Sequence, residues 1–331
     1  MVDLVHDYRG NVIENTHVGR ICVVDAGGKI ACSAGDPEAA TYYRSTSKPL
    51  QALPVLIRGL DKKYGLTDRE VAILAGSHAG EDAHVEVLLS LLDKTGFSEN
   101  DLITPLSMPA GKARDDFSRM DAPPRKLLHN CAGKHIAAMM LAKELTGDNR
   151  DYWRPECAAQ QEIKNMIAYM AAYPAASIEV GIDGCGIPVF AVPLRNMAVS
   201  YARMACPDTL DKPEVAVAAA RMSSLMNENP LMVRGAGYLC SVFNEDPNVV
   251  AKGGSDGVYG FGLKKERLGV ALKIEDSSEH AWPIIITEIL RQLNYDNAET
   301  AAKLDKLAQR VIYNDSGVEV GMAKPVFKLE I

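Results

Sequence analysis

The segment Arg44-Ser45-Thr46-Ser47-Lys48-Pro49 contains the residues best suited to covalent chemistry. A serine hydroxyl is a weak nucleophile until a base removes its proton. Residues three apart on a helix share a face, so the amine of Lys48 can reach Ser45 at a helix start, where developing negative charge is also favoured. The spacing therefore predicts a serine nucleophile. Taken singly, Ser-x-x-Lys is a weak pattern, and a helix cap beside a solvated lysine is the commoner explanation.

Two later segments strengthen this interpretation. Penicillin-recognising serine acyl enzymes carry Ser-x-x-Lys, Ser-Asp-Asn and Lys-Thr-Gly in that chain order. Here Ser77 stands just before a predicted helix, and Lys252-Gly253-Gly254 ends a predicted strand. Each has an ordinary alternative, a capped turn for Ser77 and a strand-to-strand turn for Lys252. Their order raises a serine acyl-enzyme site to about equal standing with these alternatives, and in such a site Ser77 would relay a proton between Lys48 or Lys252 and the leaving group.

A possible metal site lies elsewhere in the chain. Cys131 and Lys134 are three apart at a predicted helix start, and Cys185 lies in a glycine-dense turn. Thiolates are good zinc ligands, but this is not a standard zinc spacing. From the residues alone, buried cysteines with a surface Lys134 are the commoner explanation. The chain has seven cysteines, an odd and widely spaced set without an export signal, which indicates reduced thiols.

Hydrophobic periodicity gives the elements that must position these residues. Alternation over Arg20 to Ala34 around Asp25-Ala26-Gly27-Gly28 predicts a β-hairpin, and apolar residues from Lys48 onward predict an amphipathic helix. Three short β-type runs form a predicted meander over 249–251, 257–263 and 268–274. Helices are expected over 68–75, 81–92, 133–145, 156–173, 193–205, 212–226 and 280–293, strand-like residues over 178–192, and a long loop over 105–124.

Strands at both ends with helices between them predict an α/β (α+β) fold, in which an antiparallel sheet built from both chain ends carries helices on its faces. We divide this single unit into a mostly sheet-containing part, 1–60 plus about 178–331, and a mostly helical inserted part, about 61–177. His84 and His280 have the pattern of exposed helix residues.

Composition narrows the function classes. The 331 residues are 47% hydrophobic with a formal charge of −7, and the basic residues are scattered. These values favour a globular enzyme and disfavour nucleic acid or an acidic membrane surface as partner. The first ten residues lack a secretory pattern, and no apolar run has the roughly 20 residues of a spanning helix. We therefore expect no membrane partner and a cytoplasmic location.

Taken together, the motifs resemble the rhizobial-type L-asparaginases. The resemblance covers nearly the whole chain, and these segments carry it: Arg44-Ser45-Thr46-Ser47-Lys48-Pro49-Leu50-Gln51-Ala52-Leu53-Pro54, Ser77-His78-Ala79-Gly80-Glu81, His129-Asn130-Cys131-Ala132-Gly133-Lys134-His135, Gly181-Ile182-Asp183-Gly184-Cys185-Gly186 and the Lys252 turn. The resemblance implies a serine β-lactamase/glutaminase-like fold, a homodimer, and hydrolysis of L-asparagine to L-aspartate and ammonia.

The resemblance also implies roles for individual residues. Ser45, Lys48, Ser77 and Lys252 are the expected catalytic set. The expected zinc ligands are Cys131, Lys134 and Cys185, holding one zinc per chain that assists substrate binding, and Cys240 matches a further family cysteine loosely. For the substrate we expect contacts from Arg44 and Asp183, whose opposite charges suit its carboxylate and amino groups, and from His78 and Gly253.

Two positions depart from the β-lactamase pattern, because His78-Ala79 follows Ser77 and Gly253 follows Lys252. The alternatives are a β-lactamase or peptidase-like serine acyl enzyme and a non-catalytic zinc-binding module of the same fold. The preference between asparagine and glutamine is not readable from the sequence, since one methylene changes a pocket preference by only about 1–3 kcal/mol.

Overall fold

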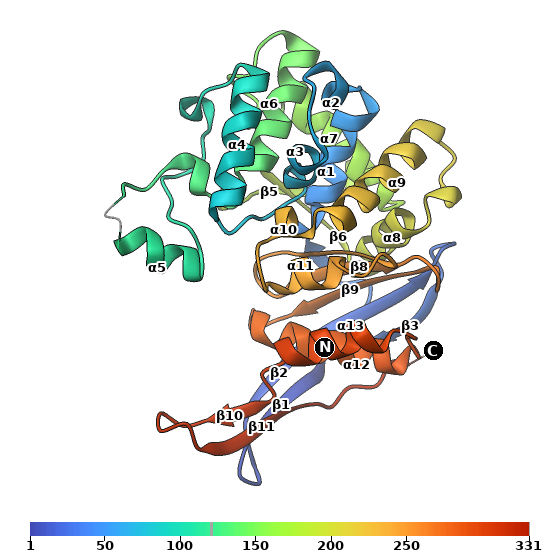
Figure 1. Ribbon diagram of the computed structural model, residues 1–331. Coiled ribbons are helices and arrows are strands. Elements are labelled where there is room, and N and C mark those ends of the chain that lie inside the picture. The colour runs from blue at the N-terminus through green and yellow to red at the C-terminus, as the bar shows by residue number, and fades with distance from the viewer. Residues whose placement is uncertain (120–121, 331) are drawn as a thin grey trace.

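An antiparallel sheet of eight strands forms the base of the molecule in the computed structural model, which describes residues 1–119 and 122–330 (Figure 1). Along the sheet the order is β10-β11-β1-β2-β9-β8-β7, and β3 pairs with β2. The strands are β1 (Val2–Arg9), β2 (Val12–Asp25), β3 (Ile30–Ala34), β7 (Val249–Gly253), β8 (Val258–Leu263), β9 (Leu268–Ile274), β10 (Val311–Tyr313) and β11 (Glu319–Pro325). Strands from both chain ends therefore share one sheet, as predicted.

The junction between the N-terminal and C-terminal strands is the centre of this sheet. Ile21 of β2 lies opposite Leu272 of β9, and Val23 lies opposite Val270, all four fully buried. The predicted hairpin joins β2 to β3, where the Asp25 carboxylate accepts hydrogen bonds from the backbone N–H groups of Gly27 and Lys29 at 2.9 and 3.0 Å. The predicted meander β7-β8-β9 is likewise confirmed.

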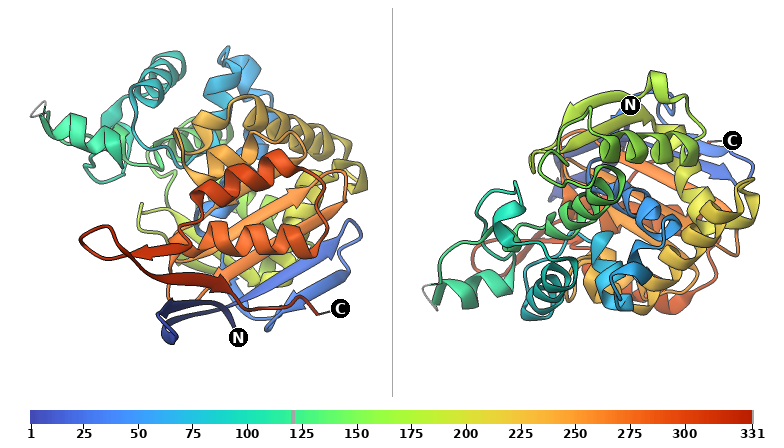
Figure 2. Two further views of the ribbon diagram at one scale, coloured as in Figure 1. Left: turned by 60° about the horizontal axis from the view of Figure 1, so that its bottom comes forward. Right: turned by 90° about the horizontal axis from the view of Figure 1, so that it is seen from above.

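Helices cover both faces of the sheet (Figure 2). The helix α8 (Leu194–Ala205) packs on β8, β9 and β2, where Gly269 permits the approach because an added Cβ would lie 2.1 Å from the Ala198 carbonyl oxygen. On the other face lie α12 (Trp282–Gln292) and α13 (Ala298–Leu307). Two helical layers therefore enclose the sheet in a three-layer arrangement, which confirms the predicted α/β class.

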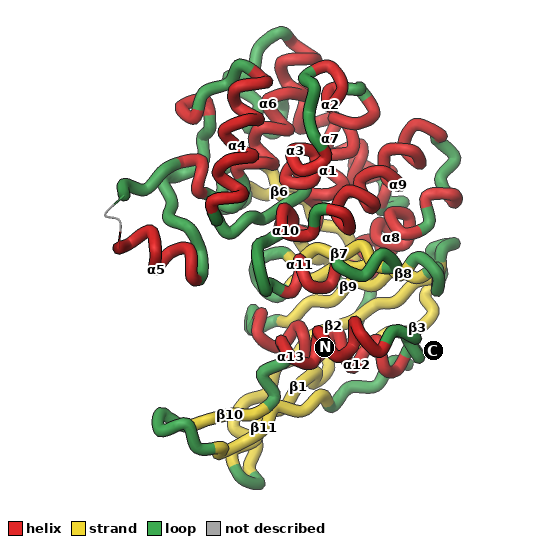
Figure 3. The backbone as a smooth tube through the Cα atoms, viewed as in Figure 1, coloured by secondary structure: helices red, strands yellow, loops and turns green. Residues whose placement is uncertain are grey.

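The remaining helices form a second region above the sheet (Figure 3). At its centre is α1 (Lys48–Ile57), whose side chains are buried except at its last residue. Around it lie α2 (Leu60–Lys63), α3 (Asp68–Leu74), α4 (Asp82–Thr95), α6 (Ala132–Thr146), α7 (Ala158–Met170), α9 (Pro213–Glu228), α10 (Pro230–Val233) and α11 (Leu239–Asn244). A small sheet of β4 (Ala40–Tyr42), β6 (Pro188–Pro193) and β5 (Glu179–Ile182) adjoins them. Helix α1 packs against α6, α7 and α9, so helices from both predicted parts of the chain lie side by side. The boundary of the helical part at about 61–177 therefore stays a prediction.

The structure corrects two expectations. The predicted loop 105–124 contains a helix, α5 (Lys112–Arg119); it has no fully buried residue, so no apolar stripe marked it in the sequence. The predicted exposed His84 is fully buried, because its ring accepts a hydrogen bond from the Glu81 N–H and contacts the Leu231 carbonyl. Residues 120 and 121 of that loop lie outside the described part of the chain. Among the described residues, no helix combines the length and apolarity required to cross a bilayer.

Candidate functional site

Ser45 lies in a short 3-10 turn, η1 (Arg44–Ser47), that leads directly into α1. Arg44 has a φ of 48°, a left-handed conformation that is uncommon for a residue with a side chain. The turn is fixed by hydrogen bonds: Ser47 Oγ donates to the Arg44 carbonyl at 2.9 Å, and Tyr201 Oη donates to the Thr46 carbonyl at 2.7 Å. Strained backbone held by its surroundings is common at functional sites, and here it precedes the predicted nucleophile.

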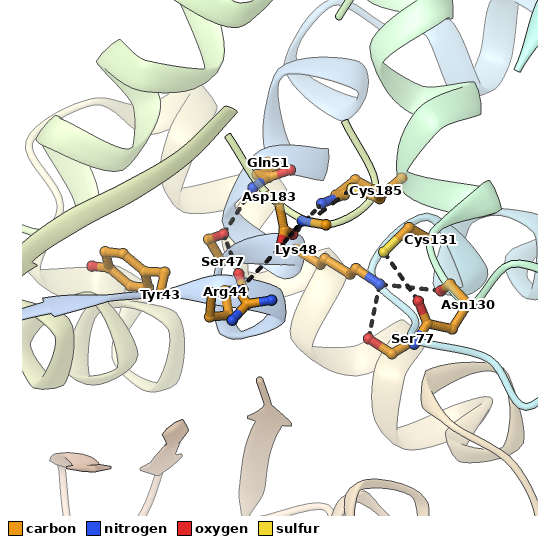
Figure 4. A network of polar contacts seen from close by, with 12 residues as sticks. Tyr43, Arg44, Ser47, Lys48, Gln51, Ser77, Asn130, Cys131, Asp183 and Cys185 are labelled. Carbon is orange, nitrogen blue, oxygen red and sulfur yellow. Dashed lines mark hydrogen bonds and ion pairs between the residues drawn. The ribbon is translucent and has the colours of Figure 1, made fainter. Parts of the chain in front are cut away.

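Lys48 is fully buried and donates hydrogen bonds to Ser77 Oγ at 2.8 Å and to the Asn130 carbonyl at 3.1 Å (Figure 4). Burial lowers the pKa of its amine, because the charged form loses solvation. The predicted direct contact with Ser45 is not among the hydrogen bonds of the described residues. The two predicted catalytic elements Lys48 and Ser77 are nevertheless brought together by α1 and the segment after α3.

Lys252 is the second buried lysine, at the end of β7, and its Nζ donates to the Gly253 carbonyl at 2.6 Å. Burial lowers the pKa of this amine to about 7, and the nearby charges of Lys48 and Arg234 act in the same direction. A substantial neutral fraction is therefore present at neutral pH. A neutral amine is a base, which an ordinary surface lysine is not at this pH.

Ser45, Ser77 and Lys252 line one small cavity of about 60 Å³. Gly253 and Gly254 form part of its wall, and an added Cβ at Gly254 would lie 2.8 Å from the Tyr43 carbonyl oxygen and 3.1 Å from Ser45 N. The position after Gly253 therefore needs a residue without a side chain for β7 to approach the serine turn. The strand end, the serine turn and the segment at Ser77 thus meet at a single place.

Sequence reasoning missed three residues that line the same cavity: Arg234, Glu279 and Trp282. Arg234 donates from Nη1 to the Ser77 carbonyl at 2.8 Å and stacks over the Tyr238 ring. Burial raises the pKa of the Glu279 carboxyl. Trp282 begins α12, so its place in the cavity follows from the packing of α12 and from no local motif. In the sequence, only the glycine-rich turn Arg234-Gly235-Ala236-Gly237 after α10 could have indicated that Arg234 belongs to the site.

A second cluster adjoins the cavity and contains the predicted metal residues. Cys131 lies at the N-terminus of α6, Lys134 follows one turn later, and Cys185 lies in the turn between β5 and β6; all three are buried. The pKa of the Cys131 thiol is lowered well below its usual range, first by a hydrogen bond with Cys185 and then by the charges of Lys48 and Lys134. Because Lys134 is buried, the alternative interpretation of this residue as a surface lysine is wrong.

Asp183 connects this cluster to the serine turn. Its carboxylate accepts from Arg44 Nε at 3.0 Å and from Lys134 Nζ at 3.3 Å. Burial raises the pKa of this carboxyl, but the charges of Lys134 and Arg44 outweigh the effect and the pKa is lowered. Arg44 and Asp183 thus pair with each other, and their expected contacts with the substrate stay a prediction.

His78 and Cys240 flank the cavity. His78 is buried, its pKa is lowered well below the usual range by burial, and neither ring nitrogen has a hydrogen-bond partner among the described residues. It lines a neighbouring cavity together with Asn130 and Arg234. Cys240 lines the serine cavity itself, and its Sγ accepts from Gly253 N at 3.1 Å. The role expected of His78 in substrate binding remains a prediction.

The antiparallel sheet, its helical layers and a polar cavity with buried lysines define an α/β protein whose site is suited to acid-base chemistry. The sequence model of the L-asparaginase II family matches residues 5–325, so the chain belongs to that family. The family indicates a hydrolase that acts on amides and has a small-molecule substrate. The comparison with curated proteins gave no match.

The chain is similar to several solved structures. A putative β-lactamase from Bacteroides dorei is 14% identical, covers 78% of this chain and 85% of its own, and gives a TM-score of 0.44. A β-lactamase from Mycobacterium bovis is 13% identical, with 83% and 94% covered and a TM-score of 0.44. A protein named Mglu is 14% identical, with 79% of this chain but 59% of its own covered and a TM-score of 0.42.

Proposed function

We propose that the protein is an L-asparaginase, which hydrolyses the side-chain amide of L-asparagine to L-aspartate and ammonia through a covalent intermediate on Ser45. The observation that carries the proposal is the single cavity shared by Ser45, Ser77 and Lys252, with Lys48 hydrogen-bonded to Ser77. Membership of the L-asparaginase II family supports the amide substrate.

The proposed acylation uses Lys48 as base. A neutral amine has two N–H donors and one lone pair; Ser77 and Asn130 engage the donors, which leaves the lone pair to accept the Ser45 proton. Ser45 Oγ then bonds to the amide carbon, and the N–H of Ser45 is the backbone donor that we assign to the developing oxyanion. The C–N bond breaks as the proton passes from Lys48 through Ser77 to the leaving nitrogen, which departs as ammonia.

Deacylation requires a water molecule and a second base. Lys252, with a pKa of about 7, supplies a neutral amine in the same cavity. Lys252 takes a proton from water as the water oxygen bonds to the ester carbon; the bond between that carbon and Ser45 Oγ then breaks, Oγ takes the proton from Lys252, and aspartate is released. Contacts from Arg234 and Glu279, which line the cavity with opposite charges, extend the set expected to hold the carboxylate and amino groups of the substrate.

The two buried thiols of the adjoining cluster suit zinc, and Lys134 would complete the ligand set as a neutral amine once it has lost its proton. We assign Cys131, Lys134 and Cys185 as ligands of one zinc per chain, and a bound zinc would supply a positive charge that assists binding of the substrate. Metal analysis of the purified protein and of Cys185→Ala tests this assignment: we expect the variant to lose one zinc, and full retention would remove Cys185 from the site. Cys157→Ala, at a partly buried cysteine outside the cluster, is the matched control.

The substrate is tested by measuring ammonia release from L-asparagine and L-glutamine, together with covalent labelling by a fluorescent penicillin. We expect turnover of asparagine and no label. A penicillin label on Ser45 without amide turnover would instead establish the β-lactamase or peptidase-like alternative. Bound metal without turnover of any of the three would establish a non-catalytic zinc-binding module. A cytoplasmic location and a homodimer stay predictions.

A further inference from the structure

A second cluster of metal-ligating side chains lies outside the proposed active site, on the face of the sheet that α12 covers. Val5 of β1 pairs with His17 of β2, and Asp7 pairs with Asn15, so Asp7 and His17 are diagonal neighbours on one face. His280 reaches the same place from the short 3-10 turn η6 (Glu279–Ala281) that begins α12. One ligand atom from each of Asp7, His17 and His280 lies within 4.8 Å of the other two.

From this arrangement we propose that Asp7, His17 and His280 form a second divalent-metal site, selective for cations that favour imidazole and carboxylate ligands, such as zinc. Asp7 and His17 are buried, and their facing atoms, Oδ2 and Nε2, are 3.0 Å apart. Ligands held at about 2.0–2.2 Å from one zinc lie about 3.3 Å apart in a tetrahedron. The two buried ligands are therefore already nearly at the required separation.

The surroundings of His17 support a role as ligand. Its other ring nitrogen, Nδ1, lies 2.6 Å from the Asp276 carboxylate. A histidine that binds metal usually donates its second N–H to such a carboxylate, which fixes the tautomer and directs the free lone pair toward the metal. Here that arrangement directs Nε2 toward Asp7. His280 packs edge-on against His17 at 5.2 Å between ring centroids, and because it is exposed it can rotate toward the metal without disturbing the core.

A metal at this site would join β1 and β2 to η6. The neighbours of His280 along the chain include Glu279 and Trp282, which line the cavity that contains Ser45. Occupation would therefore fix the segment that supplies one wall of that cavity. The site itself does not depend on the proposed asparaginase activity, nor on the cysteine cluster.

The test is zinc stoichiometry of metal-stripped protein after equilibration with zinc, compared among wild type, His280→Ala and His6→Ala. His6 is a half-buried histidine on the same strand as Asp7 and provides the matched control. We expect His280→Ala to bind one zinc fewer per chain, His6→Ala to match wild type, and zinc to raise the unfolding temperature of wild type more than that of His280→Ala. His17→Gln should show the same deficit. Equal zinc content in wild type, His280→Ala and His17→Gln would overturn the proposal, whatever the cysteine cluster binds.

Discussion

Replacing Lys252 with methionine should stabilise the protein while it abolishes turnover. A lysine ordinarily titrates near 10.5, and burial lowers the pKa of Lys252 to about 7. Each pKa unit corresponds to about 1.4 kcal/mol, so below pH 7 the buried, protonated Lys252 destabilises the folded protein by about 5 kcal/mol. Methionine has a similar length and no charge, but it removes the hydrogen bond to the Gly253 carbonyl, worth about 1 kcal/mol. We expect a net gain of about 2–4 kcal/mol at pH 6.

The sign of the pH dependence follows from proton linkage. Between pH 7 and 10.5 the unfolded wild-type chain binds more protons at this lysine than the folded chain, so the stability of wild type rises with pH across that window. The advantage of Lys252→Met is therefore full below pH 7 and disappears as the pH approaches 10.5. Urea unfolding of both proteins from pH 6 to pH 10 measures it. Lys265→Met, at an exposed lysine after β8, is the matched control and should change stability by less than about 0.5 kcal/mol. If the free energies of unfolding of wild type and Lys252→Met differed by the same amount at every pH, the claim that burial lowers the pKa of Lys252 would be refuted.

Two further substitutions test the geometry. Ser77→Ala removes the hydroxyl that accepts a hydrogen bond from Lys48. We expect steady-state kinetics to show a kcat lower by about 10²–10⁴-fold and urea unfolding to show a stability loss near 1 kcal/mol. An unchanged kcat would exclude the proton relay through Ser77. Gly254→Ala places a Cβ 2.8 Å from the Tyr43 carbonyl oxygen and should displace the serine turn, with kcat about 10²-fold lower and stability reduced by about 1–3 kcal/mol. Wild-type kinetics in a folded Gly254→Ala protein would show that this approach is not needed.

The elements predicted from periodicity match the structure where the pattern is strong. The hairpin at Asp25, the helix from Lys48 and the meander β7-β8-β9 all depend on local alternation and turn chemistry, which a sequence displays directly. The strand β1 was not predicted, because its two fully buried residues, Leu4 and Val5, are adjacent and break the alternation. The strands β10 and β11 were not predicted either, because most of their side chains are exposed or only partly buried. Helix α5 escaped prediction for a similar reason, since it buries no residue fully.

The candidate site shows the same division between local and non-local information. Ser45, Lys48, Ser77 and Lys252 stand in short motifs, so each could be identified as a candidate from the sequence alone. Which atoms they contact was not predictable: Lys48 is hydrogen-bonded to Ser77 and Asn130, 29 and 82 residues away along the chain. Burial of Lys134 was also hidden, because α6 has apolar residues all round and therefore no exposed face that its sequence would reveal.

The central claim is that Ser45 is the nucleophile of an amide hydrolase, and the most direct test is ammonia release from L-asparagine by wild type, Ser45→Ala and the neighbouring control Ser47→Ala. Ser47 belongs to the same turn, where its hydroxyl donates to the Arg44 carbonyl and accepts from Gln51. We predict that Ser45→Ala loses turnover by at least about 10³-fold while remaining folded, and that Ser47→Ala keeps measurable activity. Turnover by a folded Ser45→Ala protein at the wild-type rate would contradict the proposed mechanism.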